Sequence, residues 1–156
     1  MKSTHSLPSS PANAPAINTH SAVLVRDFIQ AVLNRGDLSQ LETFIHHAYH
    51  YFSPTEEIVG GDALRAFIQM LRTAFPDLNV QVKEQISEAH KVCTRVVMTG
   101  TQLGEFNGIP PTGRRIEIEG VIISQLEAGR IRQEWELLDQ YALLQQLGLL
   151  PEESSA

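Results

Sequence analysis

The hydrophobic period of the chain changes at Pro76, and this change restricts the possible folds more than any other feature. Before Pro76, apolar residues recur at the spacing of one helix face: Leu64, Phe67, Ile68, Leu71 and Phe75. After Pro76, apolar and polar residues alternate over residues 78–83, as in a strand with one buried face. Because proline cannot continue a helix, the helix that opens at Gly61 must end at Phe75.

The other predicted elements follow the same division. Two helices come first, over residues 21–33 and from Leu38 to about His47, and Asp37 suits the N-cap of the second. Three further strands come later, over residues 92–103, 115–127 and 131–138, before a short closing helix. Helices followed by strands with short turns indicate an α+β fold with antiparallel strands. We expect one domain, over residues 20–150, in which the N-terminal helices pack on a curved antiparallel sheet and enclose a pocket.

Composition limits the compartment and the partners. Hydrophobic residues make up 42% of the chain and the formal net charge is −6, which is typical of a soluble globular domain. Since Lys and Arg are not concentrated anywhere, we expect no nucleic-acid partner, and no run approaches the roughly 20 apolar residues of a membrane-spanning helix. The single cysteine, Cys93, fits a reducing cytoplasm. Residues 1–19 are predicted to be a disordered tail without a secretory signal, and residues 151–156 a flexible end.

Histidines and aromatic residues follow the second predicted helix. His46 and His50 are four residues apart, but no HExxH pattern or cysteine accompanies them, so we interpret them as a solvated helix end and expect no metal site. The aromatic residues Tyr49, Tyr51 and Phe52 either pack in the core or form the wall at one end of a pocket. Further on, the loop over residues 104–114 has three glycines and two prolines, and we expect it to fold over an edge or an opening.

The last predicted strand carries the only tryptophan and ends on an acid. Counting back in steps of two, Asp139 shares a face with Leu137 and Trp135. If that face is concave, a carboxylate there is poorly solvated, and desolvation brings a carboxyl pKa closer to the range that proton transfer needs. The alternative is that Asp139 caps the helix that follows, which is a common position for aspartate.

Four segments of the chain carry a family resemblance in their order and spacing. They are AVLNRGDLSQLETF, FPDLNVQV, TGTQLGEFNGIPPTGRRIEIEG and GRIRQEWELLDQYALLQQLG, within residues 22–150. The strongest part runs from Gly100 through the PPTG sequence to the WxxxD of Trp135 and Asp139. Together they resemble the SnoaL-like polyketide cyclase (ester cyclase) family, which belongs to the wider group with the nuclear transport factor 2 fold.

The resemblance implies an α+β cone that is usually dimeric. In the characterised cyclases it implies cofactor-free intramolecular aldol ring closure of a polyketide methyl ester, and it implies that Asp139 is the general acid/base. Two positions depart from the family pattern. Gln102 stands where many members have a histidine in a GTHTG-like segment, and Phe52 aligns with a second histidine. Gln102 can hydrogen-bond a substrate oxygen but cannot transfer a proton.

We therefore expect Asp139 and Gln102 to be catalytic. Five residues are expected to bind substrate: Trp135, Met98, Phe52, Tyr49 and Leu137. The expected protein is a cytoplasmic homodimer that performs cyclase- or isomerase-type acid/base chemistry on a hydrophobic polyketide-like substrate, without cofactor or metal. The alternative is a non-catalytic protein whose pocket binds a hydrophobic small molecule.

Epoxide hydrolysis on the same cone is a neighbouring possibility, because Glu117, Glu119 and Arg95 supply further acids and an arginine. Apolar residues occupy both faces of the strand over residues 115–127, so the alternation assigns neither glutamate to the pocket or to solvent.

Overall fold

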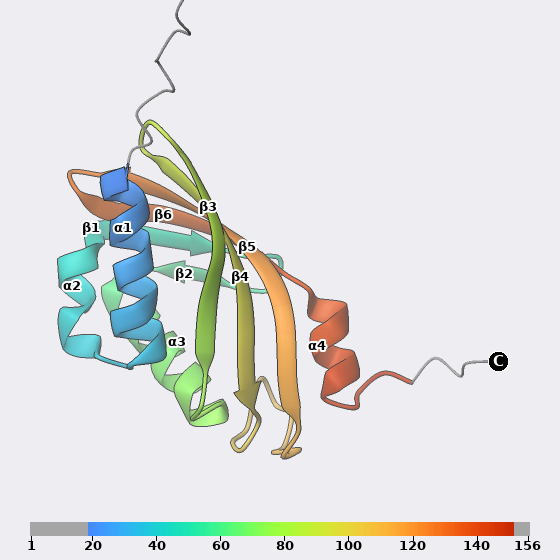
Figure 1. The fold of residues 1–156 in the computed structure, drawn as a ribbon. Coiled ribbons are helices and arrows are strands. Elements are labelled where there is room, and N and C mark those ends of the chain that lie inside the picture. Colours follow the sequence, from blue (N-terminus) through green and yellow to red (C-terminus); the bar gives the residue numbers. More distant parts are fainter. Residues whose placement is uncertain (1–18, 152–156) are drawn as a thin grey trace, which may run out of the picture.

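The computed structural model describes residues 19–151, in which the first three helices lie on one side of a curved sheet (Figure 1). Helix α1 (Thr19–Phe28) continues as a π-helix (Ile29–Asn34), and a 3-10 turn (Leu38–Gln40) leads into α2 (Leu41–Phe44). Helix α3 spans Gly61–Ala74, and α4 (Gln140–Gln146) follows the last strand. Apart from Thr19 and Pro151, the predicted terminal segments lie outside the described residues. No helix within residues 19–151 is both long and apolar enough to cross a membrane.

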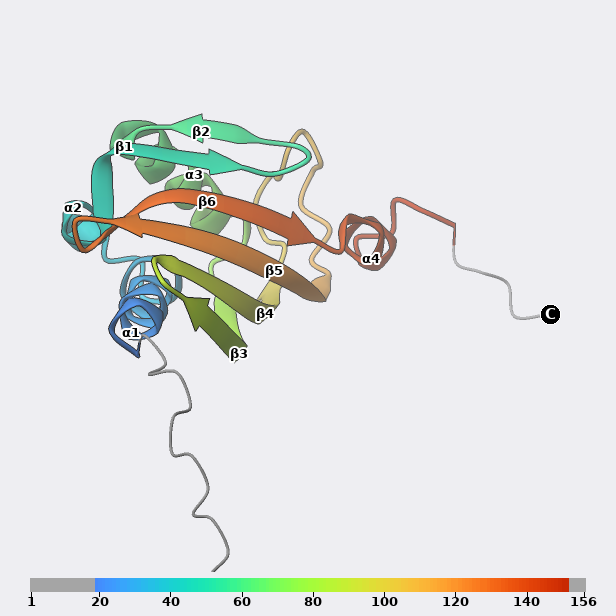
Figure 2. The same ribbon diagram turned by 90° about the horizontal axis from the view of Figure 1, so that it is seen from above.

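The sheet has six strands, and Figure 2 shows it from above. The strands are β1 (Ile45–Phe52), β2 (Glu57–Val59), β3 (Asn79–Glu88), β4 (Lys91–Thr101), β5 (Arg115–Glu127) and β6 (Arg130–Leu138). Their spatial order is β2-β1-β6-β5-β4-β3. Neighbours are antiparallel, except that β1 and β6 are parallel. The predicted α+β class and the four long antiparallel strands are confirmed. The structure adds β1 and β2, and the parallel pair of β1 and β6 makes the sheet mixed where an antiparallel sheet was expected.

The difference comes from β1, whose first residues were predicted to be the end of a helix that reaches about His47. Helix α2 ends at Phe44, and residues 45–52 are extended. Their alternating pattern buries Tyr49 and Tyr51 on the face that the helices cover. His46 and His50 are therefore strand residues. Within residues 19–151, no group of three or more His, Cys, Asp or Glu side chains is arranged to hold a metal ion.

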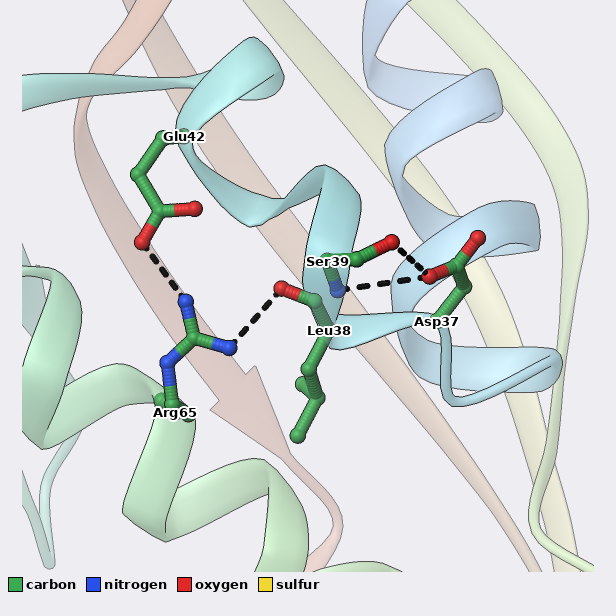
Figure 3. Close-up of polar contacts among 5 residues, drawn as sticks. All are labelled: Asp37, Leu38, Ser39, Glu42 and Arg65. Carbon is green, nitrogen blue, oxygen red and sulfur yellow. Dashed lines mark hydrogen bonds and ion pairs between the residues drawn. The ribbon is translucent and has the colours of Figure 1, made fainter.

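Helix α3 has the predicted bounds and a buried apolar face that includes Leu64 and Ile68. Arg65 of α3 joins this helix to the 3-10 turn and to α2 (Figure 3). The Arg65 guanidinium donates to the Leu38 carbonyl at 2.9 Å and to the Glu42 carboxylate at 2.6 Å. Asp37 caps the 3-10 turn by accepting from the Ser39 N–H, so the predicted N-cap is confirmed. These contacts fix the helices over the inner face of the sheet.

A β-bulge in β6 decides which of its side chains face inward. Ile131 pairs with Leu126 of β5, but the next pair along β6 is Gln133 with Gln125, so Arg132 is an extra residue. Since side chains alternate along a strand, one extra residue moves all later side chains to the opposite face. Ile131 is buried, and beyond the bulge it is the even-numbered residues of β6 that face the helices.

Candidate active site between the sheet and the helices

A cavity of about 120 Å³ lies between the inner face of the sheet and the helices. Most of its lining is apolar or aromatic, and includes Phe28, Leu64, Phe67, Phe75, Met98, Ile118 and Ile122. Four polar residues come from β1 and β6: Tyr49, Tyr51, Glu134 and Glu136. Five more come from the surrounding loops and α4: Ser53, Thr55, Glu56, Asn107 and Gln140. None of the described residues that line the cavity is Lys, Arg or His, so its ionisable side chains are acids and tyrosines.

Glu134 is buried, and both of its carboxyl oxygens accept hydrogen bonds. The Tyr49 hydroxyl donates to Oε1 at 2.8 Å, and the Ser124 hydroxyl donates to Oε2 at 2.8 Å. Burial raises the pKa of the Glu134 carboxyl, although the two hydrogen bonds oppose that shift. A buried carboxyl with both oxygens engaged is rigidly held, and this one joins β6 to β1 and β5.

Glu136 lies two residues further along the same face and is held more loosely. The Tyr51 hydroxyl donates to its Oε1 at 3.0 Å. Burial raises the pKa of the Glu136 carboxyl to about 7; the Tyr51 hydrogen bond lowers it and the nearby Glu134 charge raises it. Near neutral pH this carboxyl therefore exists in both protonation states. A group of this kind, in contact with an apolar cavity, can both accept and return a proton.

Asp139 lies elsewhere, so the prediction that it faces a concave pocket is wrong. It is exposed, and its carboxylate accepts from the Ala142 N–H at 3.0 Å, which makes it the N-cap of α4. Asp139 does share a face with Leu137 and Trp135, but that face points away from the helices, and the two side chains are 64% and 38% exposed. The extra residue in β6 is the physical reason.

The other predicted site residues divide between the cavity and the rest of the fold. Tyr49 and Met98 line the cavity. Phe52 stacks on Trp135 with ring centroids 6.0 Å apart, and Trp135 lies on the outer face. Gln102 is fully buried but does not line the cavity, since its amide binds the loop that follows β4.

The structure also resolves the ambiguity of β5. Ile116, Ile118 and Ile122 line the cavity, so Glu117 and Glu119 are exposed on the outer face. Arg95, the third residue of the epoxide-hydrolase alternative, is also on the outer face, beside Glu84 and Glu119. These residues therefore supply no acid or arginine to the cavity.

Glu134 and Glu136 are not among the predicted site residues, because the expected inner face of β6 is the one that carries Asp139. The signal in the sequence is that Trp135 is flanked on both sides by an acid. An alternating strand must place Trp135 on one face and both acids on the other. The pattern alone does not say which face is inside, because that depends on the bulge at Arg132.

The chain is similar in sequence and in fold to known proteins. The family model described as SnoaL-like polyketide cyclase matches residues 23–147. The aklanonic acid methyl ester cyclase DnrD of Streptomyces peucetius is 28% identical over 131 residues, which cover 80% of this chain and 88% of that protein.

Two solved structures share the fold at similar identity. TsrD from Streptomyces laurentii is 30% identical with a TM-score of 0.77, covering 85% of this chain and 98% of that chain. AclR from Streptomyces galilaeus, described as a putative hydroxylase, is 28% identical with a TM-score of 0.77, covering 88% and 86%. Because the family model spans nearly all of the described residues, this chain belongs to the SnoaL-like polyketide cyclase family.

Proposed function

We propose that the protein is a cofactor-free cyclase in which Glu136 transfers protons during an intramolecular aldol-type ring closure of a hydrophobic, polyketide-like substrate. The observation that carries this proposal is the position of Glu136, a carboxyl with a pKa of about 7 on the wall of an apolar cavity. Aldol closure needs one group that first removes a proton and then returns it, and a pKa near the working pH suits both steps.

The proposed reaction conserves every atom of the substrate. Ionised Glu136 removes a proton from a carbon next to a substrate carbonyl, and the resulting enolate carbon attacks a ketone carbon of the same molecule. One carbon–carbon bond forms, and the new alkoxide takes the proton back from Glu136. The substrate's own conjugation delocalises the enolate charge. Proton transfer by a placed side chain contributes about 10²–10⁴-fold.

Tyr51 and Glu134 support this role of Glu136 in different ways. Tyr51 fixes the orientation of the Glu136 carboxyl through its 3.0 Å hydrogen bond. Glu134 is occupied by Tyr49 and Ser124, so we assign it a supporting role in which its charge contributes to the raised pKa of Glu136. The walls are mostly apolar and carry acids but no cationic side chain, so they favour a substrate whose body is apolar and whose acid is masked as an ester.

Aklanonic acid methyl ester, named as the substrate of the relative DnrD, is the first ester to test. The purified protein is incubated with it, and products are separated by liquid chromatography with mass detection. We expect a product of unchanged mass and altered retention, and we expect Glu136→Gln to lose it while Asp139→Asn keeps it. A product heavier by one oxygen would contradict cyclisation. Tight binding of the ester without conversion would instead support the non-catalytic alternative.

A further inference from the structure

The amide of Gln102 holds the loop between β4 and β5 from inside. Its Nε2 donates to the carbonyls of Ile109 at 3.1 Å and Pro110 at 3.3 Å. Its Oε1 accepts from the hydroxyl of Thr112 at 2.7 Å and from the backbone N–H of the same residue at 3.3 Å. The backbone of Gln102 adds bonds to Arg114 and Gly113. The fully buried Gln102 side chain therefore fixes residues 109–112, in the second half of the loop, to the end of β4.

The first residues of the loop, Leu103 and Gly104, are fixed to the end of α3. The backbone N–H groups of Leu103 and Gly104 both donate to the Ala74 carbonyl, at 2.9 and 3.1 Å. A Cβ atom at Gly104 would lie 2.5 Å from the Thr73 carbonyl oxygen, so only glycine allows this approach. The loop is thus attached at both ends, and its tip is the part that reaches the cavity.

The tip is a tight hairpin. The N–H of Phe106 donates to the Ile109 carbonyl at 3.0 Å, and the N–H of Ile109 donates back at 2.8 Å. Asn107 and Gly108 between them have φ values of 48° and 79°, which suits the Asn-Gly pair of a two-residue turn. The Phe106 ring packs edge-on against Phe75 with centroids 5.4 Å apart. These contacts give the hairpin a defined position on the cavity wall.

Asn107 is the polar residue that this hairpin brings to the cavity. It is exposed and lines the cavity together with Ser53, Thr55 and Glu56 of the β1–β2 connection. Among residues 19–151 no group hydrogen-bonds the Asn107 side chain, so its amide is available to a ligand.

We propose that Asn107 is a specificity-determining residue that hydrogen-bonds a neutral polar group at the outer end of the substrate, and that Gln102 is a positioning residue that holds the hairpin. The preferred substrate then has two polar ends on an apolar body. One carbonyl lies at Glu136, and a second carbonyl or hydroxyl lies at Asn107. This inference rests on the proposed use of the cavity, but not on its chemistry.

The test is a binding comparison between two rigid neutral ketones, 2-acetylnaphthalene and 2,6-diacetylnaphthalene. Both can place one acetyl group at the inner carboxyl end, and only the second has another carbonyl at the opposite end. Dissociation constants are measured by equilibrium dialysis for the full-length protein. We expect the wild type to bind the diacetyl compound about fivefold more tightly, which corresponds to one net hydrogen bond.

Two variants remove the proposed contact in different ways. Asn107→Gly keeps the left-handed turn but removes the amide, and Gln102→Ala removes the support of the hairpin. Both should bring the affinity ratio of the two ketones to about one. If Gln102→Ala does not fold, Thr112→Val replaces it in the test. This variant removes only one hydroxyl donor to Gln102, so it should lower the affinity ratio partly. Glu105→Gln, in the same loop but outside the lining, is the matched control and should leave the ratio unchanged.

An unchanged ratio in Asn107→Gly would overturn the assignment of Asn107. An unchanged ratio in folded Gln102→Ala, or in Thr112→Val when Gln102→Ala does not fold, would overturn the positioning role of Gln102. Failure of the wild type to distinguish the two ketones would overturn both. The measurement is of binding, so it does not depend on turnover. A protein that does not distinguish the two ketones but has cyclase activity would contradict only the role of Asn107. A protein that distinguishes the ketones but has no cyclase activity would contradict only the proposed function.

Discussion

The two faces of β6 differ in every property that matters for chemistry. On the inner face, Glu134 and Glu136 lie in an apolar cavity and bind the hydroxyls of tyrosines and a serine. On the outer face, Trp135 and Leu137 are exposed, and Asp139 at the strand end caps α4. Burial raises the pKa values of both inner-face carboxyls, because there they are removed from water.

The comparison shows that, in this strand, the face on which a side chain lies matters more than its residue type. Acids occur on both faces, and a large aromatic ring lies on the face opposite the cavity. A single extra residue, Arg132, sets that face, and its guanidinium donates to the Ala48 carbonyl of β1. The bulge therefore determines which carboxyl can take part in proton transfer.

The largest expected effect separates the acids of the two faces. Glu136→Gln keeps the shape of the inner face but removes the base, so we expect turnover of the ester to fall about 10²–10⁴-fold. Asp139→Asn should change turnover less than about threefold, since asparagine is an equally good N-cap. Single-turnover and steady-state rates of both variants check this. Equal losses in the two variants would mean that the faces are not chemically distinct.

A second prediction concerns the outer face. We propose that a second copy of the chain covers its exposed apolar residues, which are Val121, Ile123, Trp135 and Leu137. Leu137→Lys would bury an unpaired charge in such an interface and should weaken the dimer about a hundredfold. Analytical ultracentrifugation would then show a shift toward the 17.3 kDa single chain. Val23→Lys, at an exposed position of α1, is the control. A wild type that sediments only as single chains would refute the dimer.

A third prediction concerns stability and pH. The pKa of Glu136 is about 7 in the folded protein, against an ordinary value of 4.5. Between these values the unfolded chain binds fewer protons, so the free energy of unfolding falls as pH rises from about 4.5 to 7. The loss should be on the order of 3 kcal/mol, because the two pKa values differ by about 2.5 and one pKa unit corresponds to about 1.4 kcal/mol. Urea unfolding at several pH values measures it, and Glu136→Gln should remove this part of the pH dependence.

The smallest expected effect is the loss of the cap on α4. Asp139→Ala removes the acceptor for the Ala142 N–H and should lower the free energy of unfolding by about 1 kcal/mol. Asp139→Asn should cost only a few tenths of that. Thermal unfolding of the two variants measures the difference. A large loss of stability in Asp139→Asn would show that this carboxylate does more than cap the helix.

The elements that could be predicted from the sequence have a uniform period. Helix α3 and the first half of β3 show regular apolar spacing, and the structure confirms them. Strand β1 was missed because it follows a helix of only four residues and mixes histidines with aromatic side chains. Its partner β6 lies far along the chain, and parallel pairing of this kind leaves no local signal.

The candidate site was harder to predict because it depends on register. Tyr49 and Met98 could be identified as wall residues from their type and place in the pattern. Glu136 could not, because a bulge is a property of the pairing between two strands. Gln102 illustrates a different difficulty, since a buried amide can serve a ligand or a loop equally well until its partners are known.

The pKa of Glu136 tests the central claim most directly. It is measured by a carbon-detected NMR titration of the side-chain carboxyls, with Glu136→Gln to assign the resonance. We predict a value of about 7, as expected for a carboxyl that is desolvated on the inner face and held by Tyr51. A value near the ordinary 4.5 would mean that the carboxyl is solvated, and it would contradict the assignment of Glu136 as the proton-transfer group.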